Sequence, residues 1–385
     1  MKMIVVLDQK LDTTLIGILM FETDSSSGVV HWMPSFVLLV WQFPDSHHSG
    51  TIPPQLGRLS FLVSLDLTSN IFGGALPPEL SFLHRLKFIS LRLNNFTGAI
   101  PPLFGHFPKL ESLNLRNNSF TGSIPKSLSN LTNLRFLDLT SNSLSGEMPK
   151  ELGKLQNLQR LWIRLNHLSG AIPSRIFNMS KMESMALGDN ELSGSLPTDI
   201  CSTLPPEIGN LHNLVGFGVE INQIGGSFPL HMFVNMPYLE ELSLWRNNFT
   251  GNLSRNLWNL TKLTYFDLTE NMTGLIPTEF GQLYQLKTLG LGLNRFSGPI
   301  PRELFNISTL QFIDLVRNVI SGVLPTNICH TSPSLKELHL GLNSISGQIP
   351  NSISNCSQLT KLSLGDNKFS GYTYGSRKPK SSQKH

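Results

Sequence analysis

The sequence predicts an α/β solenoid, with short parallel strands on its concave face and 3-10 or loop segments on its convex side. Three observations lead to this fold class. An LxxLxLxxN pattern recurs about thirteen times, eleven of the twelve intervals between its closing asparagines are 23 to 25 residues long, and a Gly and a Pro follow most of these asparagines at fixed distances. Repetition at such a period is the signature of a stacked-repeat architecture.

The alternating apolar residues of each pattern predict a short strand with one buried side. Leu134, Leu137 and Leu139 are one such set. A single unit cannot bury its apolar side alone, so stacked units are expected to share one continuous core.

An Asn closes each strand, and its amide can bond to backbone groups of the neighbouring turns, so that the column forms a ladder. The Gly that follows allows a backbone conformation that a Cβ would penalise, and the Pro ends the strand pairing. The ladder asparagines are Asn70, Asn94, Asn118, Asn142, Asn166, Asn190, Asn222, Asn247, Asn271, Asn294, Asn318, Asn343 and Asn367.

The repeat resembles the plant extracellular form of the leucine-rich repeat, LxxLxLxxNxLSGxIPxxLGxLxx. The narrower match lies in SGEMP at Ser145–Pro149, TGAIP at Thr97–Pro101 and SGQIP at Ser346–Pro350. The chain is similar to the ectodomains of plant leucine-rich-repeat receptor kinases and of kinase-less receptor-like proteins, and PPEIGNLHNL is most similar to the immune-type receptor kinases. The resemblance implies a horseshoe or superhelix that binds a ligand and pairs with a co-receptor that itself carries leucine-rich repeats.

The repeats are expected to occupy residues 46–371, between an irregular segment 1–45 without a recognisable cap and a basic, disordered tail 372–385. Repetition starts at Ser49–Gly57, which matches the second half of a repeat whose strand is expected to be absent. The sequence shows no clear signal peptide, no apolar segment long enough to span a membrane and no kinase signature. We therefore expect a truncated ectodomain fragment.

One interval departs from the period, because Asn190 and Asn222 are 32 residues apart. The flanks of the irregular junction near residues 198–208 both match the template. This favours the loss of some 16 residues, including one strand, over the alternative of an eight-residue loop insertion.

Charge and cysteine content narrow the functional class. The formal charge of +4 is concentrated in the tail, so the body is near neutral, which argues against a nucleic-acid partner. Three cysteines, Cys201, Cys329 and Cys356, are an odd and low number that favours buried thiols over a bridge between the last two.

Asn-x-Ser/Thr sequons indicate an extracellular origin. Asn271 is itself a ladder residue, so we expect it to be buried and unmodified. The glycosylation candidates are Asn95, Asn117, Asn130, Asn178, Asn248, Asn252, Asn259, Asn306 and Asn355.

Residues between the core leucines are expected to face solvent on the concave sheet and to form the ligand-binding surface, because Arg and aromatic residues are typical of binding hot spots. Further along the chain, Phe312 and Arg317 occupy positions of the same kind. The candidates are Phe88, Arg92, Arg116, Arg135, Phe136, Arg160, Trp162 and Arg164, with a second group of Trp245, Arg246 and Tyr265.

No catalytic motif of the GxxxxGK[ST], GxSxG or HExxH type occurs, and neither a cofactor nor a metal is expected. His47 and His48 lack further ligands nearby. An Asp recurs four residues before the ladder Asn at Asp66, Asp138, Asp267 and Asp314, and we expect these carboxylates to be solvent-facing strand residues repeated by duplication.

The leading hypothesis is a non-catalytic ectodomain that recognises a peptide or protein in plant defence or developmental signalling, at the extracellular face of the plasma membrane or in the cell wall. One alternative is a soluble decoy or a polygalacturonase-inhibitor-like protein. The other is a fragment of a gene whose full product has Ser/Thr kinase activity.

Overall fold

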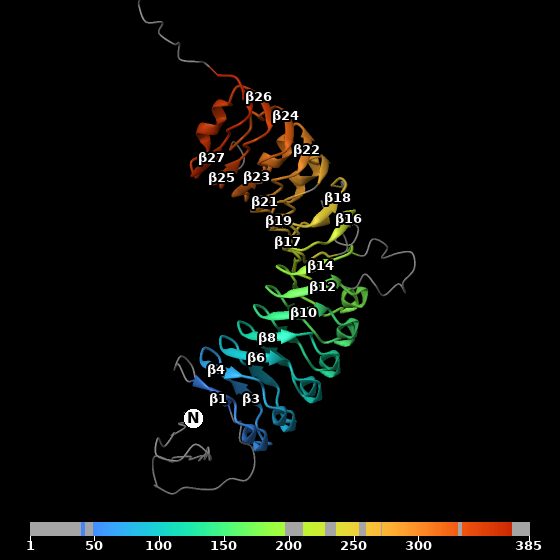
Figure 1. Ribbon diagram of the computed structural model, residues 1–385. Coiled ribbons are helices and arrows are strands. Elements are labelled where there is room, and N and C mark those ends of the chain that lie inside the picture. Colours follow the sequence, from blue (N-terminus) through green and yellow to red (C-terminus); the bar gives the residue numbers. More distant parts are fainter. Residues whose placement is uncertain are drawn as a thin grey trace, which may run out of the picture.

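The computed structural model describes residues 40–42, 49–196, 211–227, 236–253, 259–270, 272–329 and 333–371. Within these residues the chain winds into a curved and twisted coil of short turns (Figure 1). Each turn contributes a strand to the concave sheet, a second short strand to the side, and in most turns a 3-10 helix to the convex face. The predicted solenoid is confirmed.

The concave face is one parallel sheet of 14 strands that follow one another in chain order. Its central residue is a buried leucine or another apolar side chain in almost every turn, as the period-2 pattern requires. The strands are β1 (Val40–Gln42), β3 (Ser64–Asp66), β5 (Phe88–Ser90), β7 (Ser112–Asn114), β9 (Phe136–Asp138), β11 (Arg160–Trp162), β13 (Ser184–Ala186), β15 (Gly216–Gly218), β17 (Glu241–Ser243), β19 (Tyr265–Asp267), β21 (Thr288–Gly290), β23 (Phe312–Asp314), β25 (Glu337–His339) and β27 (Lys361–Ser363).

A second set of strands follows the ladder asparagines and forms lateral sheets of seven, two and five strands. The first is β2 (Ser49–Gly50), β4 (Ile71–Gly74), β6 (Asn95–Ala99), β8 (Ser119–Gly122), β10 (Ser143–Glu147), β12 (His167–Ala171) and β14 (Glu191–Ser193). The others are β16 (Gly225–Ser227) with β18 (Asn248–Thr250), and β20 (Thr273–Leu275), β22 (Arg295–Gly298), β24 (Val319–Val323), β26 (Ser344–Gly347) and β28 (Lys368–Phe369).

The convex side carries five-residue 3-10 helices, most of which begin directly after the template Pro. The Pro fixes φ near −65°, which suits the entry into such a helix. They are η1 (Pro54–Arg58), η2 (Pro78–Phe82), η3 (Pro102–His106), η4 (Lys126–Asn130), η5 (Lys150–Lys154), η6 (Ser174–Asn178), η8 (Thr278–Gln282), η9 (Arg302–Asn306) and η10 (Asn351–Asn355).

The core and the asparagine ladder follow the sequence prediction. Leu115, Leu139 and Leu291 are fully buried in one continuous apolar cluster. The Nδ2 of Asn142 donates to the carbonyl of Leu139 in its own turn, at 3.0 Å, and to that of Leu115 in the preceding turn, also at 3.0 Å. Its Oδ1 accepts the backbone N–H of Phe120 at 3.0 Å, so each amide joins adjacent turns.

The residue just before each ladder Asn adopts the left-handed region, which the sequence pattern did not reveal. Ser141 has φ of 59° and Leu165 has φ of 56°, although neither is a glycine. The strained conformation persists because it aligns backbone donors with the next turn: the N–H of Ser141 bonds to the carbonyl of Arg164 at 2.8 Å.

The expected absence of a strand before Ser49 is wrong. Strand β1 pairs in parallel with β3, and Trp41 is opposite Leu65. In sequence, Leu38, Trp41 and Phe43 have the LxxLxL spacing, but the two aromatic residues in place of leucines hid the match. Strand β1 therefore lies within the segment 1–45 that was expected to be irregular. Residues 1–39 and 43–48, including His47 and His48, lie outside the described part.

At the irregular junction, strand β13 pairs directly with β15, with Ser184 opposite Gly216. The ladder continues across it, because Oδ1 of Asn222 accepts the N–H of Leu192 at 2.9 Å. The described residues on the two sides of the junction are therefore direct neighbours in the concave sheet and in the ladder. Residues 197–210, with Cys201, lie outside the described part, and the pairing is compatible with either the loss or the insertion considered above.

A disulfide joins Cys329 to Cys356, whose Cα atoms are 5.0 Å apart. The preference for free thiols at these two positions is therefore wrong. Cys329 lies four residues after Pro325 and Cys356 lies six residues after Pro350, on the convex side of adjacent turns. Stacking brings their side chains together, which the count of three cysteines could not show.

Candidate functional site

The first candidate group lies on four adjacent concave strands. Phe88 on β5 and Phe136 on β9 lie in one row of the sheet, with Ser112 of β7 between them and Arg160 of β11 next in line. Arg135 directly precedes β9. Side chains at equivalent positions of neighbouring strands are about 4.8 Å apart, so these residues form one surface.

Arg92 and Arg116 occupy the same position of successive turns, two residues before the ladder Asn, and both are exposed. Among the described residues, no carboxylate oxygen lies within 4.0 Å of the guanidinium groups of Arg92, Arg116 or Arg135. We call the surface formed by Phe88, Arg92, Arg116, Arg135, Phe136, Arg160 and Trp162 the basic face.

The aromatic residues of the basic face are held in place by neighbouring side chains. The rings of Phe136 and Trp162 meet edge to face with centroids 5.2 Å apart. The indole Nε1 of Trp162 donates to Oγ of Ser184 at 2.9 Å. A fixed aromatic surface loses little conformational entropy when it binds another molecule.

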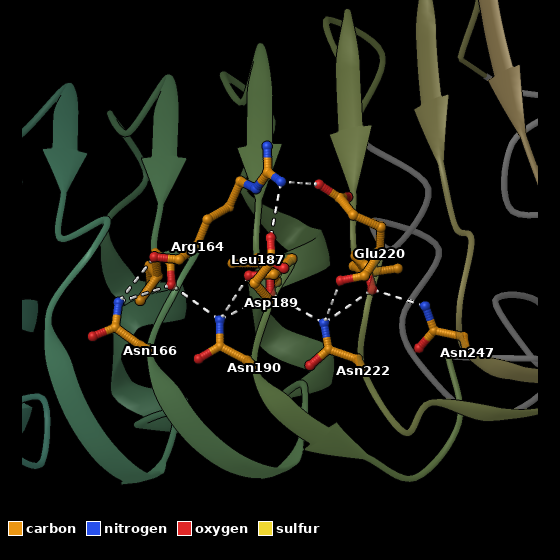
Figure 2. A network of polar contacts seen from close by, with 11 residues as sticks. Arg164, Asn166, Leu187, Asp189, Asn190, Glu220, Asn222 and Asn247 are labelled. Atoms are coloured by element: carbon orange, nitrogen blue, oxygen red, sulfur yellow. Dashed lines mark hydrogen bonds and ion pairs between the residues drawn. The ribbon is translucent and has the colours of Figure 1, made fainter.

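Arg164 differs from the other arginines, because it is already paired within the chain. Its Nη2 lies 2.9 Å from Oδ2 of Asp189 and 2.8 Å from Oε1 of Glu220 (Figure 2). The guanidinium thereby joins three successive turns across the irregular junction. Arg164 belongs with the predicted residues in space, but its charge is neutralised by the protein itself.

Asp138 is not solvent-facing, which corrects the expectation for this aspartate: the residue is 1% exposed. Its Oδ1 accepts the backbone N–H of Thr140 at 3.0 Å. The Oδ1 atoms of Asp66, Asp267 and Asp314 likewise accept the backbone N–H of the residue two positions later in the chain. The column of Asp residues shapes the bend after each strand. Burial raises the pKa of Asp138, while the bonds from Thr140 and the charges of Arg116 and Arg92 oppose that rise.

The second candidate group lies beyond the junction. Tyr265 on β19 donates from its hydroxyl to Oδ2 of Asp267 at 3.2 Å. Arg246 lies 5.8 Å from the ring centroid of the adjacent Trp245 and 3.7 Å from a carboxylate oxygen of Glu270. Phe312 of β23 packs against His339 with centroids 5.5 Å apart, and Arg317 is exposed. The two groups are thus separate regions of one concave sheet.

The sequence interpretation missed Glu220 and Glu241, which lie between the two groups. Glu220 is 5% exposed, and Glu241 is exposed on β17. The available signal was the position two residues before the ladder Asn, which holds Arg92, Arg116 and Arg164 before the junction and Glu220 after it.

The sequons differ in accessibility. Seven are exposed, Asn117 is half-buried with φ of 52°, and Oδ1 of Asn178 is buried. Asn271 lies outside the described part. The exposed sequon residues are Asn95, Asn130, Asn248, Asn252, Asn259, Asn306 and Asn355.

The described residues contain neither a membrane-spanning helix nor a cluster of metal ligands. None of the helices there combines the length and the apolarity needed to cross a bilayer. In the same residues, no group of three or more His, Cys, Asp or Glu side chains is arranged to hold a metal ion.

Comparisons with known proteins agree with the repeat. The model of the leucine rich repeat family matches residues 84–144, and a second leucine rich repeat model matches residues 238–260 and 334–356. Receptor-like protein 36 of Arabidopsis thaliana is 33% identical over 88 residues, which are 22% of this chain and 12% of that protein.

Two solved structures are similar over most of the chain. One is the Arabidopsis receptor kinase HAESA in complex with the peptide hormone IDA and the co-receptor SERK1, at 31% identity and a TM-score of 0.73, covering 83% of this chain and 56% of that one. The other is the plant peptide hormone receptor RGFR1 in complex with RGF2, at 28% identity and a TM-score of 0.67, covering 83% and 57%.

The likeness to plant leucine-rich-repeat receptor ectodomains is thereby confirmed. The chain spans only about half the length of these solved receptors and about an eighth of the curated relative.

Proposed function

We propose that this leucine-rich-repeat solenoid of the plant receptor type is a non-catalytic recognition module whose basic face binds an acidic stretch of a peptide or protein. The observation that carries the proposal is that Arg92, Arg116 and Arg135 have no carboxylate partner among the described residues and lie beside the packed rings of Phe136 and Trp162. Arginine recognises carboxylates through paired hydrogen bonds, and aromatic residues with Arg dominate binding hot spots. Recognition of this kind needs complementary surfaces and no covalent step.

The biological setting is part of the same proposal. Ligand binding would serve defence or developmental signalling, with a second leucine-rich-repeat chain as co-receptor along a side face. The solved neighbours support this, since one is in complex with a peptide hormone and a co-receptor. The bridge between Cys329 and Cys356 and the exposed sequons support export to an oxidising, extracellular compartment.

The test uses the full chain, secreted and glycosylated, and a display library of random 16-residue peptides. Wild-type protein is expected to enrich peptides that contain Asp or Glu. In Arg92→Ala/Arg116→Ala, the affinity for the enriched peptides should fall about 100-fold, since each lost charge-assisted bond costs about tenfold.

The matched control is Lys126→Ala/Arg302→Ala, which removes two positive charges from exposed residues of η4 and η9 on the convex side. This control should bind like the wild type. Failure to enrich any peptide, or equal affinity of the two double variants, would contradict the proposal.

A further inference from the structure

Carboxylates gather on the concave sheet just beyond the irregular junction. Glu220 lies just after β15, Glu241 on β17 and Asp267, a member of the recurring Asp column, on β19, while Arg246 follows β17 and pairs with Glu270. No Lys or Arg nitrogen lies within 4.0 Å of the carboxylates of Glu241 and Asp267 in the described part of the chain. We call Glu220, Glu241 and Asp267, with Trp245 and Tyr265, the acidic face.

One carboxylate oxygen of Glu220 lacks a donor. The side chain is almost fully buried, and only Oε1 meets Arg164. Oε2 is buried and has no hydrogen-bond partner among the described residues, although the hydroxyl of Ser243 is close enough to lower the pKa of the carboxyl. A buried carboxylate oxygen without a donor is costly, so a donor arriving with a ligand would be favoured.

The side chain of Glu220 packs over Gly188 and Gly218, where any other residue would collide with it. A Cβ on Gly188 would lie 2.6 Å from Cδ of Glu220, and one on Gly218 would lie 2.8 Å from Oε2. At Gly216 a Cβ would meet only Oγ of Ser184 at 3.7 Å and Oε2 of Glu241 at 3.9 Å. The backbone of β15 is therefore open at Gly216, beside the carboxylate of Glu241, and covered by Glu220 at Gly218.

Burial and neighbouring like charges act together on these groups. Burial raises the pKa of Glu220, and the charge of Asp189 adds to that rise. Burial also raises the pKa of Asp267, with Asp314 adding to it, and the pKa of Tyr265 is raised by burial and then by Asp267 and Glu220. A bound cation would relieve these repulsions, and the ring of Tyr265 provides a face that attracts cations, as the ring of Trp245 already does for Arg246.

We propose that the acidic face binds a cationic group, an ammonium or guanidinium, of the same ligand whose acidic stretch lies on the basic face. The ligand would then be a bipolar peptide. This inference rests on the proposed function and adds the chemistry of the second half of the ligand.

The strand order sets the spacing of the two charges. Five strand steps separate β7, which precedes Arg116, from β17, which carries Glu241. At about 4.8 Å a step the distance is about 24 Å, which an extended peptide covers in about seven residues. Acid and cation in the ligand are therefore expected about seven residues apart.

The experiment is the same random 16-residue display library, selected on the wild-type chain and on two variants. Glu241→Gln removes an exposed carboxylate without an ion pair, so its fold should be intact. Glu220→Gln tests the buried carboxylate with a side chain of equal size. The control is Glu147→Gln on the lateral strand β10. Thermal unfolding confirms folding of each variant.

Wild type and Glu147→Gln should enrich peptides with Lys or Arg about seven residues from Asp or Glu. In Glu241→Gln the preference for Lys or Arg should vanish while that for Asp or Glu stays. Affinity for a wild-type-selected peptide should fall about tenfold.

Three results count against the inference. Enrichment of acidic peptides without a basic residue overturns it and leaves the proposed function standing. A basic preference that Glu241→Gln and Glu220→Gln both leave unchanged places the cation elsewhere and also overturns it. No enrichment at all contradicts both proposals.

Discussion

The turns before and after the junction share one core template and differ in nearly everything placed on it. The first block, 49–196, has a continuous lateral sheet and a concave surface rich in arginine. The second block, 211–371, has a divided lateral sheet, a concave surface with carboxylates and glycines, and a disulfide near its end. At the position after the template Gly, the first block has Ala99 in its TGAIP segment. The second block has Leu275 and Val323 at the same position, and each is 61% exposed.

This difference indicates that stacking and recognition use separate positions of the repeat. The leucines and ladder asparagines are the same in both blocks because each turn must fit its neighbours. The positions between them are free to vary in charge and size. Perturbing the two kinds of position in each block tests this separation.

The largest effect is expected in the core, where the two blocks should respond alike. Leu137 and Leu289 are fully buried central residues of β9 and β21. Leu137→Ala and Leu289→Ala should each lower the free energy of unfolding by about 3 kcal/mol, because a cavity replaces packed atoms. Urea unfolding measures both. A difference of more than about 2 kcal/mol would mean that the two cores are not equivalent.

The disulfide should affect only the second block. Cys329→Ser/Cys356→Ser is expected to cost about 2–4 kcal/mol, because the unfolded chain regains the freedom that the bridge removed. In a stack that is stabilised by neighbour contacts, the loss should stay near the affected turns. Hydrogen exchange should therefore speed up in residues 333–371 and stay unchanged in 49–196. Uniform acceleration would show that the blocks unfold as one unit.

Arg164 is ion-paired, whereas Arg116 has no carboxylate partner among the described residues, so the two should contribute differently to stability. Arg164→Ala leaves Glu220 buried without its partner, so we expect a loss of about 2 kcal/mol, reduced from the usual cost of breaking a buried pair because Arg164 is partly exposed. Arg116→Ala should change stability by less than about 0.5 kcal/mol. Chemical denaturation of the two variants side by side decides the matter, and equal losses would refute the distinction.

The sequence predicted the solenoid, the buried leucines and the ladder because each depends on a residue type that recurs at a fixed period. It did not predict β1, since Trp41 and Phe43 replace leucines of the template. The bridge between Cys329 and Cys356 depends on which positions meet after stacking. The same holds for Arg164, whose partners Asp189 and Glu220 are 25 and 56 residues away.

The smallest effect concerns pH and belongs to the second block. Burial, with a contribution from Asp314, raises the pKa of Asp267 above its ordinary value of 3.8, while bonds from Thr269 and Tyr265 oppose the rise. The unfolded carboxyl therefore binds its proton less tightly than the folded one, so ionisation disfavours the fold at neutral pH. Stability should rise as pH falls through the raised pKa towards 3.8.

Asp267→Asn should remove this dependence, because its side-chain oxygen can still accept the N–H of Thr269, whereas the amide does not ionise. The wild type, measured in the same series, is the reference. Urea midpoints between pH 7 and pH 4 measure both. A steeper rise in Asp267→Asn than in the wild type would mean that ionised Asp267 stabilises the second block, and the acidic face would then lack the repulsion that a bound cation is expected to relieve.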